Sequence, residues 1–297
     1  MGVQKIIQHT LWMGTALTLG ALVRSKFERS HLSVVHYRVE TDKKIEGERR
    51  FVFLSDLHEN SFGKNNRILV ENIENLSPDA VLIGGDLPVV KKELCFLQTL
   101  NLLEQLTEKF PVYYANGNHE LRMKRNRHKY GNAYCFFYRQ LEEMGVIYLS
   151  DQKADFDQDI EIFGVDLDDR FFKRGKTPKM DGEYLRKKLG NCSKEKFSIL
   201  LPHSPLYFGA YAEFGADLTL AGHFHGGTIR LPGNIGLMTP QYHFFSQYVV
   251  GLKQRGKQKM IISAGLGTHS VNLRLNNQPQ LVVIDIVNTQ QGQESKV

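Results

Sequence analysis

The fold of this chain is decided by the stretch Asp217-Leu218-Thr219-Leu220-Ala221-Gly222-His223-Phe224-His225-Gly226-Gly227, an apolar run that ends in two histidines. The apolar part is typical of a short buried strand, and the glycines around the histidines let bulky groups approach the backbone. In extended backbone, residues i and i+2 face the same side, so we expect both imidazoles to point into one site. Such a pair indicates a metal site, although one ion rarely needs these two ligands alone.

The same arrangement recurs at four places upstream. Each is an apolar, strand-like run that is followed by polar side chains of the kinds that bind metals. The runs are 51–54 before Asp56 and His58, 80–83 before Asp86, 111–114 before Asn118 and His119, and 197–201 before His203. In open α/β sheets, ligands bind beyond the carboxyl ends of the strands, so we expect these segments to converge. The sequence therefore predicts one cluster of two Asp, one Asn and five His.

Apolar residues at helical spacing separate the first ligand-bearing strands. Residues 66–76 and 93–110 both show this spacing, and two strand-helix-strand units in succession predict a parallel sheet core. Residues 32–39 resemble a first edge strand, which we expect to form a hairpin with the strand at 51–54. Shorter strand-like runs between residues 160 and 287 indicate a second sheet.

The first thirty residues differ from the rest. Residues 6–23 contain no Asp, Glu, Lys or Arg and reach the lower length limit for a helix that spans a bilayer. Trp12 at one end and Arg24, Lys26 and Arg29 after the other end are typical of interfacial anchors. We expect an N-terminal membrane anchor or an uncleaved signal-like helix over residues 1–30, and an amphipathic arm is the alternative. The predicted location is the cell membrane, with the side left open.

Composition limits the remaining possibilities. With 297 residues, of which 41% are hydrophobic, the chain can form one large α/β domain with a real core. The net charge of +6 favours anionic partners such as phosphoesters or anionic lipid. Three scattered cysteines exclude a disulfide framework and a thiolate metal site. The oligomeric state is not encoded in these features.

The ordered series Asp-x-His, Gly-Gly-Asp, Gly-Asn-His-Glu, a lone His and Gly-His-x-His resembles the calcineurin-like metallophosphoesterase superfamily, over residues 50 to 287. Within it, the chain is most similar to the YkuE and YaeI type of membrane-associated phosphodiesterase. Phe224 and Thr228 depart from that type's Gly-His-Thr-His-Gly-Gly-Gln without removing a ligand. The resemblance implies a four-layer α/β/β/α sandwich of two mixed sheets, preceded by an N-terminal hydrophobic helix. It also implies a catalytic domain over 31–287 and a flexible polar tail over 288–297.

The resemblance further implies a two-metal site. Asp56, His58 and His225 would hold the first ion, Asp86 would bridge, and Asn118, His203 and His223 would complete the second. Oxygen and imidazole ligands suit Mn, Fe, Co, Ni or Zn without choosing among them. Two such ions, about 3.5–4 Å apart, activate a bridging hydroxide for in-line attack on phosphorus. His119 is expected to be the general acid, which protonates the leaving alkoxide or steadies charge in the transition state.

These features predict a membrane-associated phosphoesterase that hydrolyses a phosphodiester or a phosphomonoester of a small molecule or a lipid-linked substrate. One alternative is a lipid-nucleotide pyrophosphatase similar to those that cleave UDP-2,3-diacylglucosamine, which needs an acyl groove beside Phe136 and Phe137. The rival from another class is a non-catalytic membrane-associated scaffold, which the intact ligand set disfavours.

Two polar segments stay open at this level. The basic segment 122–129 is either a substrate clamp or a solvated helix face, and it is too short to track a nucleic acid, so a nucleic-acid partner is not expected. The acidic group Asp166, Asp168 and Asp169 is typical of a solvated turn, and a loop that contacts substrate is the alternative.

Overall fold

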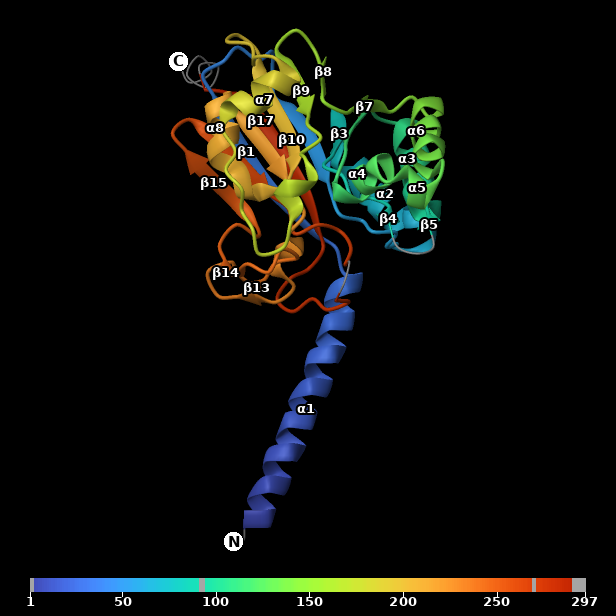
Figure 1. Cartoon of the computed structure of the whole chain (residues 1–297), viewed down its shortest axis with the longest axis vertical. Coiled ribbons are helices and arrows are strands. Elements are labelled where there is room, and N and C mark those ends of the chain that lie inside the picture. The colour runs from blue at the N-terminus through green and yellow to red at the C-terminus, as the bar shows by residue number, and fades with distance from the viewer. Residues whose placement is uncertain (1–2, 91–93, 269–270, 290–297) are drawn as a thin grey trace.

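Two six-stranded sheets form the body of the protein, and the computed structural model describes residues 3–90, 94–268 and 271–289 (Figure 1). The first sheet has the order β1 (Ser33–Thr41), β17 (Gln280–Asn288), β2 (Arg49–Leu54), β3 (Ala80–Ile83), β6 (Val112–Ala115) and β7 (Ile147–Leu149). β2, β3, β6 and β7 run parallel, as the strand-helix-strand pattern predicted, and β17 is antiparallel to β2.

The second sheet has the order β15 (Gly251–Arg255), β16 (Gln258–Ile262), β11 (Leu218–Ala221), β10 (Phe197–His203), β9 (Ile160–Gly164) and β8 (Gln152–Asp155). Its four inner strands are parallel, and its two edge strands are antiparallel to their neighbours. Every residue of β9, β10 and β11 is buried, because both faces of these strands are covered. The second sheet is therefore mixed, like the first.

Helices cover the outer face of each sheet. The first sheet packs against α2 (Arg67–Leu76), α3 (Leu97–Thr107), α4 (Asn118–Arg125), α5 (Arg127–Tyr130) and α6 (Ala133–Glu143), and the second against α7 (Gly182–Leu189) and α8 (Phe208–Phe214) (Figure 1). Three apolar cores separate the layers: one contains Val81, Leu102 and Phe137, one contains Phe53, Leu220 and Ile284, and one contains Phe163, Leu185 and Tyr211. The middle core lies between the sheets, which confirms the predicted four-layer sandwich.

Short elements complete the chain. They are the 3-10 helices η1 (Lys64–Asn66), η2 (Asp169–Phe172), η3 (Pro205–Tyr207) and η4 (His225–Gly227), the β4 (Val89–Val90) and β5 (Leu94–Cys95) pair, and a small sheet of β12 (Arg230–Leu231), β13 (Ile235–Met238) and β14 (Phe244–Ser246). β5 occupies residues that were predicted as helix, so α3 begins only at Leu97.

The predicted hairpin between the first two strands is wrong. β17 lies between β1 and β2, parallel to the former and antiparallel to the latter. The reason is burial: from Gln280 to Ile284 every residue of β17 is buried, whereas β1 alternates between exposed and half-buried residues over most of its length. A strand that is apolar on both faces takes the inner position, and the half-polar strand takes the edge.

Helix α1 (Val3–Ser30) projects from the domain, away from both sheets (Figure 1). Lys5–Ser30 is long and apolar enough to cross a membrane, and none of its apolar window is buried in the protein. The last turns of α1 are held by the segment before β17, because Glu28 accepts hydrogen bonds from the backbone N–H groups of Asn276 and Asn277 at 3.0 and 2.8 Å. At the other end of the chain β17 continues to Asn288, and most of the predicted tail, residues 290–297, lies outside the described residues.

Candidate metal centre

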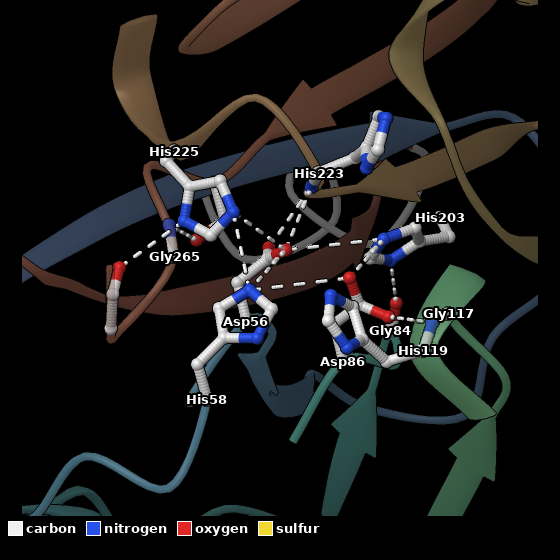
Figure 2. A network of polar contacts seen from close by, with 12 residues as sticks. Asp56, His58, Gly84, Asp86, Gly117, His119, His203, His223, His225 and Gly265 are labelled. Carbon is white, nitrogen blue, oxygen red and sulfur yellow. Dashed lines mark hydrogen bonds and ion pairs between the residues drawn. The ribbon is translucent and has the colours of Figure 1, made fainter. Parts of the chain in front are cut away.

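The predicted site residues lie together at the carboxyl ends of the strands, where the two sheets meet (Figure 2). Asp56 and His58 follow β2, Asp86 follows β3, Asn118 and His119 begin α4 after β6, His203 ends β10, and His223 and His225 follow β11. All of these side chains are buried except that of Asn118, which is half-buried. The convergence that the strand ends predicted is therefore present.

The local backbone is not the extended chain that the i, i+2 spacing predicted. β2 ends at Leu54 and β11 at Ala221, so both His-bearing pairs lie beyond the strands, and His225 begins η4. Six of the seven predicted ligands have left-handed backbone, with φ of 54° at Asp56, 50° at His58, 56° at Asp86, 62° at His203, 67° at His223 and 47° at His225. Non-glycine residues rarely adopt such angles, and clusters of them mark sites where function fixes the backbone.

The first group consists of Asp56, His58 and His225. His225 Nε2 lies 3.6 Å from Asp56 Oδ1 and 3.2 Å from His58 Nε2. His225 Nδ1 faces the carbonyl oxygen of Gly267 at 3.1 Å, so the ring proton lies there and Nε2 presents a lone pair to the group. A carboxylate oxygen and imidazole nitrogens that face one another in this way are arranged for a cation between them.

The second group consists of Asp86, His203 and His223. Asn118 lines the same cavity as Asp86 and His223. His203 Nε2 lies 3.2 Å from Asp86 Oδ2, while its Nδ1 faces the Gly84 carbonyl oxygen at 2.6 Å. Among the described residues, His223 Nε2 and Asn118 Oδ1 are buried without a hydrogen-bond partner. Buried polar atoms normally have hydrogen-bond partners. A divalent ion between these two atoms would give each of them a partner.

The two groups share Asp86. Its Oδ2 atom lies 4.0 Å from His58 Nε2 of the first group and 3.2 Å from His203 Nε2 of the second. Burial alone would raise the pKa of Asp86, but the charges of His203, His119 and His58 outweigh it and hold the pKa well below its usual value. Burial lowers the pKa of His223 and His225, which favours their neutral, metal-binding forms.

A family model for calcineurin-like phosphoesterases matches residues 49–227 of this chain. The chain belongs to this family. A metallophosphoesterase of Aquifex aeolicus described as uncharacterized is 28% identical over 92% of this chain and 98% of its own length. Phosphodiesterase YaeI of Escherichia coli is 25% identical over 88% and 90%. The metallophosphoesterase YkuE of Bacillus subtilis, also described as uncharacterized, is 34% identical over 34% of this chain and 35% of its own length.

In this calcineurin-like phosphoesterase, Glu120 fixes the loop that carries Asp86. Its Oε2 atom accepts the backbone N–H groups of Asp86 and Gly117, both at 3.0 Å, and its Oε1 accepts the Tyr114 hydroxyl at 2.6 Å. Burial, followed by the charge of Asp86, raises the pKa of Glu120 to about 8. These contacts orient the loops that carry Asp86 and Gly117.

Two glycines let the loops approach both aspartates. A Cβ atom on Gly222 would lie 2.2 Å from Asp56 Oδ2, and one on Gly117 would lie 2.2 Å from Asp86 Oδ1. Neither position has room for a side chain. The glycines in the sequence motifs are therefore required by the close approach of backbone to carboxylate.

Sequence reasoning missed Arg274, which is only 1% exposed. Its Nη2 donates to the carbonyl oxygens of Ala264, Gly265 and Gly267 at 2.9, 3.1 and 2.6 Å, and the Gly267 carbonyl in turn faces His225. Burial lowers the pKa of Arg274 to about 9. An isolated arginine outside every motif carries no sequence signal of this role.

The phosphoesterase site opens into a cavity of about 280 Å³, which His119 and Arg122 line. Asn126 of the basic segment also lines this cavity. Two other residues of the segment bind elsewhere: Lys124 Nζ donates to Asp166 Oδ2 at 2.7 Å, and Arg125 Nη2 donates to the Leu167 carbonyl oxygen at 2.9 Å. Asp166 is buried, so its assignment to a solvated turn is wrong. Its carboxylate accepts hydrogen bonds from the side chains of Asn116, Lys124 and Ser150, which hold it in the interior.

The described residues form no acyl groove beside Phe136 and Phe137, which the lipid-nucleotide alternative needs. Phe137 is fully buried in the core under α6, and Phe136 is exposed and stacks on Phe96 with ring centroids 6.2 Å apart. Neither ring is among the described residues that line the metal cavity. Helical spacing on α6 sends these neighbouring rings to different faces.

Proposed function

We propose that this protein hydrolyses phosphoesters, with phosphodiesters favoured, by means of two divalent ions. Asp56, His58 and His225 would hold one ion, and Asn118, His203 and His223 the other, with Asp86 between them. The observation that carries this proposal is two groups of buried acceptor atoms, with contacts of 3.2 to 4.0 Å, that Asp86 links through His58 and His203. The name of the relative YaeI supports the diester preference.

Divalent ions in these positions supply a water-derived nucleophile at neutral pH and neutralise charge on the phosphoryl oxygens. The chain's own cations assist substrate binding, because Arg122, Lys173 and Arg174 line the same cavity and attract an anionic ester. Phe172 covers one side of the site, with its ring centroid 5.2 Å from that of His223. We assign these residues to binding and orientation of the phosphoester.

His119 would act on the leaving oxygen. Its Nδ1 accepts the backbone N–H of Val90 at 2.7 Å, so the neutral ring carries its proton on Nε2. Nε2–H is then the group offered to the cavity, either as a general acid or as a donor that stabilises charge in the transition state. Membership of His119 in the same buried cluster as His58 and Asp86 supports a position for this donor beside the ester bond that would break.

We further propose that α1 anchors the catalytic domain, residues 31–287, to a membrane. The length and apolar character of Lys5–Ser30 support this, and none of the residues in its apolar window is buried in the protein. Arg24, Lys26 and Arg29 at the end nearest the domain would lie at the level of the lipid head groups.

The test is hydrolysis by the purified full chain. The metal-stripped protein should be inactive, and manganese or another divalent ion supplied alone should restore hydrolysis of bis(4-nitrophenyl) phosphate. Parallel assays with 4-nitrophenyl phosphate measure the preference for diester over monoester. Absence of hydrolysis with Mn, Fe, Co, Ni and Zn would reject the enzymatic proposal and leave the non-catalytic scaffold.

A further inference from the structure

A second, apolar cavity of about 220 Å³ lies beside the metal cavity. The two cavities share His225, Arg174 and Pro240, so their walls are continuous. The walls of the second cavity also include Met238, Val271 and Leu273. The exposed walls of this recess are mostly apolar, although threonine and arginine side chains also contribute to them. A mostly apolar recess that joins a polar reaction centre is typical of a site for the hydrophobic part of a ligand.

One wall of the cavity is held in place by backbone hydrogen bonds. The segment that carries Leu273 is held to the metal-site loop, because Leu275 N donates to the Thr228 carbonyl at 3.2 Å and Arg230 N donates to the Leu275 carbonyl at 2.9 Å. The buried Arg274, which belongs to the same segment, holds it in place by donating hydrogen bonds to the carbonyl oxygens of Ala264 and Gly267. A preformed recess binds an apolar chain without the cost of ordering its own walls.

The cavity lies toward the membrane-helix end of the protein. The wall segment is tied to α1 by a hydrogen bond from Arg274 N to Ser25 Oγ at 3.0 Å. Tyr242 on the cavity wall, and Phe244 and Phe245 in β14, have exposed aromatic rings, which are 49%, 61% and 64% exposed. β14 lies at the end of the domain from which α1 projects (Figure 1). Exposed aromatic side chains at the end of a domain that carries an apolar helix are typical of a surface that meets lipid.

Arg174 marks the junction between the two cavities. Its guanidinium lies 4.8 Å from the centroid of the Tyr242 ring, and its Nη1 donates to the Tyr242 hydroxyl at 2.8 Å. A cation held at this junction complements an anionic ester group that continues into an apolar chain.

We propose that the second cavity binds an aliphatic chain of the substrate whose phosphoester lies in the metal centre. This inference rests on the proposed phosphoesterase function and narrows its substrate class to amphiphilic phosphoesters. The ester would approach from the bilayer that α1 enters, with its head group at the metals and its chain along Met238, Val271 and Leu273.

Binding of phosphonates, which are not hydrolysed, tests this directly. The metal-loaded full chain in lipid nanodiscs is titrated calorimetrically with methylphosphonate and with octylphosphonate, and empty nanodiscs serve as the blank. Each buried methylene adds about fourfold in affinity, so burial of even part of the octyl chain predicts at least about tenfold tighter binding of octylphosphonate. Equal dissociation constants for the two phosphonates would overturn the proposal.

Matched substitutions test where the aliphatic chain of the ligand binds. Val271→Asp places a charge on the cavity wall at a residue that is 51% exposed, so the fold tolerates it, and it should remove most of the octyl advantage. Leu273→Asp is a second variant with the same expected loss. Leu252→Asp changes an exposed leucine on β15, outside the cavity, and should keep the advantage. An octyl advantage that survives both cavity variants would place the chain elsewhere and refute this site.

Hydrolysis of bis(4-nitrophenyl) phosphate distinguishes a failure of the proposed phosphoesterase function from a failure of the proposed site for the aliphatic chain. A wild-type protein that cleaves this soluble diester but binds both phosphonates equally is a phosphoesterase without the chain site. A protein that prefers octylphosphonate but cleaves no ester with any ion keeps the chain site and loses the proposed function.

Discussion

His58 Nε2 and His225 Nε2 face each other at 3.2 Å although 167 positions separate them in the chain. His225 directs its other nitrogen at the Gly267 carbonyl, and burial lowers its pKa, so a lone pair is aimed at the His58 ring. A cation that lies between the two imidazoles and the Asp56 carboxylate would stabilise this close approach. Because His58 follows a strand of the first sheet and His225 follows a strand of the second, a metal ion bound by both would link the two sheets.

Asp86→Asn should remove the shared carboxylate with little change in shape. We expect the metal content to fall to one ion per chain or fewer and hydrolysis to fall by about three orders of magnitude, because neither group keeps its common anion. Elemental analysis and diester hydrolysis measure the two effects. Asp181→Asn at the exposed start of α7 is the control, since asparagine also caps helices. Full metal content in Asp86→Asn would contradict the bridging role.

His119→Ala should keep both ions and lose turnover by about 10²- to 10⁴-fold, which is the usual contribution of a positioned proton donor. His128→Ala, at an exposed position on α5, should be unchanged. Esters with leaving groups of different pKa distinguish the two roles. A loss that grows as the leaving group becomes more basic indicates proton transfer, and a constant loss indicates charge stabilisation. Metal loss in His119→Ala would instead make His119 a ligand.

Metal uptake should release a proton from His203. Burial opposes the charged form, but Asp86 raises the pKa of His203 to about 10, so the metal-free ring is protonated at neutral pH. A metal ion needs the Nε2 lone pair, so binding expels that proton below about pH 10, and affinity rises as the pH approaches this value. Calorimetry in buffers of different ionisation enthalpy counts the protons. His203→Asn should release about one proton fewer, and an unchanged count would refute the assignment.

Gly222→Ala should weaken metal binding. The added Cβ would meet Asp56 Oδ2 at 2.2 Å, so the carboxylate or the loop must move. We expect metal affinity to fall by about 10- to 100-fold, as it does when groups that orient a ligand are disturbed. Gly20→Ala in α1, where a Cβ meets no atom within 4 Å, is the control. Wild-type metal affinity in Gly222→Ala would show that the approach is not tight.

Arg274→Met should lower the free energy of unfolding of the metal-free protein by about 2–4 kcal/mol, because buried carbonyl oxygens lose their donor. Its contacts with Gly265 and Gly267 also fix the loop opposite His225, so metal affinity should fall as well. Denaturant unfolding and metal titration measure these effects. Arg38→Met on the exposed face of β1 is the control, and equal stabilities of the two variants would contradict the role of Arg274.

The sequence predicted the sheets and the cluster because both depend on local pattern. An apolar run before Asp56 or Asp86 indicates a strand, and the rule that parallel strands present their carboxyl ends together brings the motifs to one edge. The order of β1, β17 and β2 could not be predicted in this way, because it depends on which strand is buried on both faces.

The backbone at the site also escaped prediction. Spacing suggested extended chain at His223 and His225, but both have left-handed φ that the surrounding contacts impose. Arg274 and the apolar cavity beside Leu273 arise from segments that meet only in three dimensions, so no motif announces them.

Anomalous X-ray diffraction from crystals of the full chain grown with manganese tests the central claim most directly. We expect two manganese peaks in each molecule, one among Asp56, His58 and His225, and one among Asn118, His203 and His223, with Asp86 contacting both. A single peak, or peaks away from these residues, would contradict the two-metal centre.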